Sequence, residues 1–124
     1  MIRTQTDARR FFIEKVMAEA RHQGVAFSDA EQQMLRWSES EPDSIGDPDL
    51  AERLSAEISD EDYESKVSAL LEAAFERDLE SDKHVLEEYR RAHALLSQGD
   101  HYILVMIDRA LGRRLRPWWK FTVG

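Results

Sequence analysis

Apolar residues recur every three or four positions along most of this chain, which is the spacing of one face of an α-helix. Segment 7–23 is the first example, because four of its apolar residues are spaced four positions apart and three more adjoin them in the sequence. They are Ala8, Phe12, Val16 and Ala20, joined by Phe11, Ile13 and Met17. Gly24 follows, and glycine commonly ends a helix because it adopts the left-handed conformation at little cost. The pattern predicts a helix over 7–23.

A capping box precedes the second predicted helix, which spans 29–38. The Ser28 side chain can accept a hydrogen bond from a free backbone amide of the first turn. Glu31, three residues later, can accept one from the Ser28 amide. The core candidates of this helix are Met34, Leu35 and Trp37.

Segment 39–48 is the one loop-like stretch, because it is rich in Ser, Asp, Pro and Gly. It ends in Asp47 and Pro48, an N-cap residue followed by proline in the first helical turn. A short helix that ends near Ile58 should follow. Residues 1–6 are predicted to be a flexible N-terminus.

Three more helices are predicted in the second half, over 60–80, 82–98 and 101–112. Ser59 and Asp100 can cap the first and the third of them. The third is apolar on almost every side before Asp108, so we expect it to lie at the centre of the fold.

The predicted fold is therefore all-α, with residues 1–124 forming a single compact domain. It has five or six helices in orthogonal or bundle-like packing, with the C-terminal apolar helix central. The expected buried residues are Phe12, Val16, Leu35, Leu54, Val67, Leu70, Leu71, Tyr89, Leu96, Leu104 and Ile107.

Composition agrees with one globular domain, since 42% of the 124 residues are hydrophobic and 34% are charged. No cysteine is present, which excludes a disulfide scaffold and a thiolate metal site. The N-terminus lacks the apolar core of a secretory signal. The longest apolar run, 102–107, is far shorter than the roughly 20 residues of a spanning helix. We expect a cytoplasmic protein without a transmembrane segment.

The net charge of −8 is unevenly distributed. Residues 29–88 hold 20 acidic and five basic side chains, a net charge of −15, whereas residues 101–124 hold five basic and one acidic, a net charge of +4. Nucleic acid is excluded as a partner of this acidic body, because phosphate contacts need clustered Lys and Arg. The acidic half is interpreted as solvated helix faces, with a surface for a basic partner as the alternative.

Glu19 and His22 form an E-x-x-H pair on the first predicted helix. Di-iron bundles use two such motifs and further glutamates, whereas this chain has one, so the pair is only a weak metal candidate. His22 fits better as a cation at the negative end of its helix. No metal or other cofactor is predicted.

His93 is predicted to lie on a buried helix face, held by one hydrogen bond, for instance from Tyr63 or Asp100. A role in proton transfer would need a neighbouring carboxylate and an accessible pocket. His84 with its neighbours Glu87 and Glu88 fits a surface ion pair. No nucleophile or phosphate-loop motif occurs, so the sequence leans against an enzyme.

The basic aromatic tail, 113–124, holds the candidate partner-binding residues. They are Arg113, Arg114, Arg116, Trp118, Trp119 and Lys120. The acidic body attracts these cations, and Trp rings gain from burial, so we expect 113–121 to fold back on this domain or on a symmetry mate. A docking peptide is the first alternative and a membrane contact is the second.

We thus expect a small, acidic, non-enzymatic helical protein that binds a macromolecular partner or self-associates as a homo-oligomer. The first alternative is a peripheral membrane protein that uses the Trp-rich tail. The second is a helical-bundle metal protein or enzyme.

Overall fold

The computed structural model describes residues 2–39, 60–99 and 101–115. These residues form α-helices and no strand, which confirms the all-α prediction. The helices are α1 (Gln5–Gln23), α2 (Asp29–Glu39), α4 (Asp60–Ser81), α5 (Val85–Leu96) and α6 (Tyr102–Leu115). The short helix predicted to end near Ile58, its core candidate Leu54 and most of the predicted loop 39–48 lie outside the described residues.

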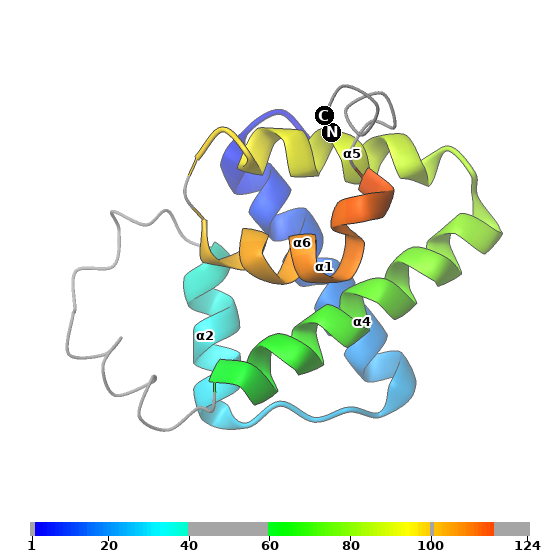
Figure 1. Cartoon of the computed structure of the whole chain (residues 1–124). Helices are drawn as coiled ribbons and strands as arrows, with labels where there is room; N and C mark the ends of the chain where they lie inside the picture. Colours follow the sequence, from blue (N-terminus) through cyan, green and yellow to red (C-terminus); the bar gives the residue numbers. More distant parts are fainter. Residues whose placement is uncertain (1, 40–59, 100, 116–124) are drawn as a thin grey trace.

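Helix α1 packs against α2, α4 and α5, and its contacts with α4 and α5 are among the most extensive between the described helices. Helix α6 packs against α4 and α5. Figure 1 shows α1 and α4 crossing each other rather than running side by side. The predicted C-terminal apolar helix, α6, contributes five residues to the core, Ile103, Met106, Ile107, Leu111 and Leu115, while Val105 on its solvent side is 55% exposed.

The hydrophobic core is continuous and draws residues from all five described helices. The predicted members are buried with two exceptions: Leu104 is only partly buried, and Leu54 lies outside the described residues. Met17, predicted beside the first stripe, is 42% exposed. Met17 directly follows the buried Val16, and Leu104 directly follows the buried Ile103. A step of one residue turns a side chain by about 100° around a helix, so Met17 and Leu104 point away from the buried face.

Tyr89 of α5 joins three helices through edge-to-face ring contacts. Its ring centroid lies 5.1 Å from that of Phe11, 5.8 Å from that of Phe12 and 4.9 Å from that of Phe75. Its hydroxyl donates a hydrogen bond of 2.7 Å to Asp78 Oδ2 on α4. The aromatic cluster thus fixes α1, α4 and α5 relative to one another.

Local capping sets the ends of the first two helices. Gly24 has a φ of 73°, the predicted left-handed conformation. The Ser28–Glu31 capping box is confirmed, with Glu31 N–H donating to Ser28 Oγ at 3.1 Å and Ser28 N–H donating to Glu31 Oε1 at 2.9 Å. Thr4 forms a second box with Asp7, so α1 starts at Gln5 and the predicted flexible N-terminus 1–6 was too long.

The predicted break after Ser81 is confirmed, since α4 ends there and α5 begins at Val85. Helix α6 continues past Gly112 to Leu115, three residues beyond its predicted end at residue 112. A mid-helix glycine costs about 1 kcal/mol relative to alanine. Leu111 and Leu115 are 0% and 2% exposed, and their burial outweighs that cost.

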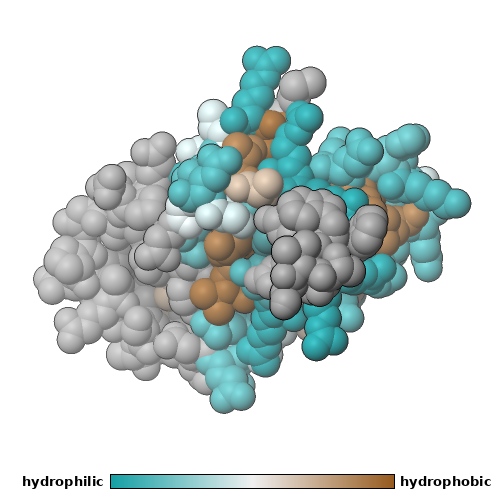
Figure 2. All heavy atoms as spheres, turned by 45° about the horizontal axis from the view of Figure 1, so that its top comes forward, coloured by the Kyte–Doolittle hydropathy of each residue, from teal (hydrophilic) through white to brown (hydrophobic). Residues whose placement is uncertain are grey.

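In the coloured part of Figure 2, polar and charged side chains predominate, with small apolar patches between them. No described helix is long and apolar enough to cross a membrane.

Candidate functional site

The predicted partner-binding residues are only partly within the described chain. Arg113 and Arg114 lie in the last turn of α6 and are exposed. The Arg114 guanidinium pairs with the Glu76 carboxylate of α4 and lies 4.6 Å from the Phe75 ring centroid. Arg114 therefore fastens the end of α6 to α4. The other four candidates, Arg116, Trp118, Trp119 and Lys120, lie outside the described residues, and their fold-back stays a prediction.

Glu19, one of the two weak metal candidates, is 2% exposed and fully engaged by hydrogen bonds. Arg77 of α4 donates to both of its carboxylate oxygens, at 2.9 and 3.0 Å, and Gln23 donates to Oε2 at 2.7 Å. The Arg77 hydrogen bonds lower the pKa of Glu19 against the opposing effect of burial. His22 is exposed. Glu19 thus joins α1 to α4, and no cluster of three possible metal ligands occurs among the described residues.

His93 is partly buried, and its partner among the described residues is Asp108 rather than the predicted Tyr63. Its Nε2 lies 2.6 Å from Asp108 Oδ1 of α6, while Asp100 lies outside the described residues. The sequence missed this pair because the two side chains come from different helices. The pair joins α5 to α6 and lines neither of the two pockets described below, although the Asp108 side chain is 36% exposed.

His101 forms a buried polar network that the sequence did not reveal. Its Nδ1 lies 3.0 Å from Arg9 Nη1, and its Nε2 lies 2.7 Å from Gln5 Oε1. A guanidinium only donates hydrogen bonds, so Nδ1 must accept and the ring proton must be on Nε2, where it faces the amide oxygen. Both ring nitrogens are occupied within the protein, which leaves neither for acid–base chemistry on a substrate.

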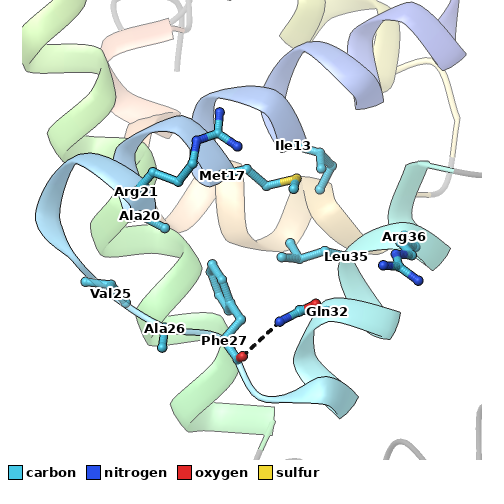
Figure 3. A pocket seen from close by; sticks show the side chains of 10 residues that line it. All are labelled: Ile13, Met17, Ala20, Arg21, Val25, Ala26, Phe27, Gln32, Leu35 and Arg36. Atoms are coloured by element: carbon cyan, nitrogen blue, oxygen red, sulfur yellow. Dashed lines mark hydrogen bonds between the residues drawn. The ribbon is translucent and has the colours of Figure 1, made fainter.

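A pocket of about 350 Å³ lies between α1 and α2. We refer to it as the α1–α2 pocket. Most of its lining is apolar, and Figure 3 shows the side chains arranged around one hollow. The lining residues are Ile13, Met17, Ala20, Arg21, Val25, Ala26, Phe27, Gln32, Leu35 and Arg36.

The connection from α1 to α2 forms one wall of this pocket and is firmly held. Gly24 turns the chain, and the Val25 amide donates to Ala20 O at 2.9 Å. Lys66 of α4 then donates to Ala26 O at 3.2 Å, pairs with Glu31 at 2.9 Å and lies 5.1 Å from the Phe27 ring centroid. The wall is thus fixed before any ligand binds.

The α1–α2 pocket is open to solvent on one side. Three of its residues, Ile13, Ala20 and Leu35, are buried and form the apolar floor. Met17 is 42% exposed and, with Phe27, flanks the opening (Figure 3). Exposed apolar surface of this kind is typical of a binding site, because a stable fold otherwise buries it.

A second hollow of about 520 Å³ lies between the N-terminal segment, α1 and α5. Its lining is mainly charged or titratable, with groups of both signs. The lining residues are Ile2, Phe11, His84, Glu87, Glu88 and Arg91. Water solvates such a surface well, so the smaller apolar pocket is the better candidate site.

No family model matches this chain, and no curated protein or solved structure matches it significantly. The geometry of the α1–α2 pocket is therefore the basis of the function proposed below.

Proposed function

We propose that this chain is a non-enzymatic binding domain, and that the α1–α2 pocket takes an apolar side chain of a protein partner. The observation that carries the proposal is an apolar pocket, open to solvent, whose Met17 side chain is 42% exposed and is one of only two exposed large apolar side chains among the described residues.

The open shape supports a protein partner over a small molecule. Half of the lining residues are exposed: Met17, Arg21, Ala26, Gln32 and Arg36. A small-molecule site commonly buries about 70–90% of the surface of its ligand and is therefore more enclosed than this pocket. A helix or loop of a protein needs only its anchoring side chains in the pocket, and the rest of it remains in solvent.

Chemistry in the pocket is not supported by its residues. Among the described residues, the lining holds no carboxylate, histidine, serine or threonine, so these residues offer no general acid, general base or hydroxyl nucleophile. Its two arginines and one glutamine can orient a polar partner group but cannot take up a proton at neutral pH.

A photo-crosslinking amino acid at position 17 tests this proposal in an extract of the native cell. Val105 on α6 is the matched control, because it is the other exposed large apolar residue of the described chain and lies outside the pocket. We expect a protein adduct from position 17 that is weak or missing from position 105. A lipid or metabolite adduct, or equal adducts from both positions, would contradict the proposal.

A further inference from the structure

The two arginines of the α1–α2 pocket come from different helices. Arg21 lies on α1 and Arg36 on α2, and Figure 3 places them at opposite sides of the hollow, with Met17, Leu35 and Phe27 between them. We call Arg21 and Arg36 the rim arginines. Both side chains are exposed.

The charge around this pocket is opposite to that of the protein as a whole. The chain has 25 acidic residues and a net charge of −8, yet the described residues that line the pocket include two arginines and no acid. Arg21 forms no ion pair with any residue that the structure describes. Its guanidinium therefore remains able to pair with a carboxylate brought by a partner.

We infer that the partner segment is an acidic amphipathic helix, with apolar anchors in the α1–α2 pocket and a carboxylate on each side of them. This inference rests on the proposed function. Helices that dock in grooves insert side chains three or four positions apart, one turn above the other. Acidic residues one turn before and after these anchors would face the rim arginines.

Arginine suits this role because its planar guanidinium can hold a carboxylate through two parallel hydrogen bonds. A ligand with a single acidic head group, such as a fatty acid, would contact only one of the two rim arginines. An anionic lipid surface is disfavoured too, because it extends beyond the pocket and would face the net charge of −15 across residues 29–88, whereas a single helix contacts only the pocket and its rim.

A displayed library of amphipathic helical peptides, selected against the full chain, tests the inference. We expect the enriched peptides to combine apolar anchors with Asp or Glu on both sides. Anisotropy titrations of the best peptide should show about tenfold weaker binding to Arg21→Glu and to Arg36→Glu, and weaker binding at high salt. A peptide whose acids are replaced by Lys should regain affinity for both variants.

Arg90→Glu is the matched control, since this exposed arginine of α5 lies outside the pocket and should bind the peptide as the wild type does. Met17→Glu separates the two proposals. If peptides bind through Met17 but show no preference for acids, the charge inference is wrong and the binding function stands. If no selected peptide loses affinity on Met17→Glu, the proposed function itself is wrong.

Discussion

Replacing Tyr89 by phenylalanine tests the polar contact at the edge of the aromatic cluster. The ring is 0% exposed, and its hydroxyl donates a 2.7 Å hydrogen bond to Asp78 Oδ2. Phenylalanine keeps the ring contacts with α1 and α4 and removes only the hydroxyl. The change in unfolding free energy therefore measures this hydrogen bond.

The expected loss follows from the exposure of the acceptor. A hydrogen bond to a charged group contributes about 1.5–3 kcal/mol to stability. The Asp78 side chain is 26% exposed and also pairs with Lys15 at 2.8 Å, so water and Lys15 partly replace the lost donor. We expect a loss of about 1–2 kcal/mol, or a fall in Tm of about 4–8 °C for a domain of this size.

Urea unfolding followed by circular dichroism measures this loss. A double-mutant cycle with Asp78→Ala isolates the Tyr89–Asp78 term, because Asp78→Ala alone also removes the pair with Lys15. A Tyr89→Phe variant within about 0.5 kcal/mol of the wild type, as for a neutral surface substitution, would refute the assignment.

The same hydroxyl predicts a dependence of stability on alkaline pH. Burial, and then the hydrogen bond to Asp78, raise the pKa of Tyr89 above its ordinary value of 10.0. Above pH 10 the unfolded chain loses this proton while the folded chain keeps it, so stability falls by up to about 1.4 kcal/mol per pH unit. Tyr89→Phe lacks this term, and the stability gap between wild type and variant should shrink above pH 10. A constant gap from pH 8 to 11 would contradict the raised pKa.

Three further predictions concern Glu19, Ser28 and the pair of glycines Gly99 and Gly112. Because the pKa of Glu19 lies below its ordinary 4.5, its contribution to stability is present above that pH and is lost in acid. Wild type should thus lose more stability than Glu19→Gln between pH 5 and 3, and parallel urea profiles would contradict this. Ser28→Ala removes the α2 cap and should lower the free energy of unfolding by about 1 kcal/mol. An unchanged Tm would show that the cap does not stabilise the fold. A Cβ at Gly99 would lie 2.7 Å from His101 Nε2, so Gly99→Ala should destabilise by about 1–3 kcal/mol. A Cβ at Gly112 would make only ordinary contacts, the closest at 3.7 Å from Asp108 Cβ, so Gly112→Ala should stabilise the fold by about 0.5–1 kcal/mol. A higher Tm for Gly99→Ala than for Gly112→Ala would refute both glycine predictions.

The sequence by itself determined the helical fold and the ends of several helices. Periodicity identified the buried stripe of α1, and the Gly24 and Ser28 signals placed its end and the start of α2 correctly. These features depend on residues within one turn of each other, and such spacing is fixed by helix geometry. The Thr4–Asp7 box has the same spacing, and it starts α1 at Gln5, two residues before the predicted start.

The tertiary structure alone decided which polar groups meet and where the surface is hollow. Glu19 and Arg77 are 58 positions apart in the sequence, and Arg9 and His101 are 92 apart. Periodicity places a residue on a face of its own helix, but it does not determine which helix packs there. The exposure of Met17 and the approach of α2 that forms the α1–α2 pocket depend on how α1, α2 and α4 pack together, because burial is a property of several helices at once.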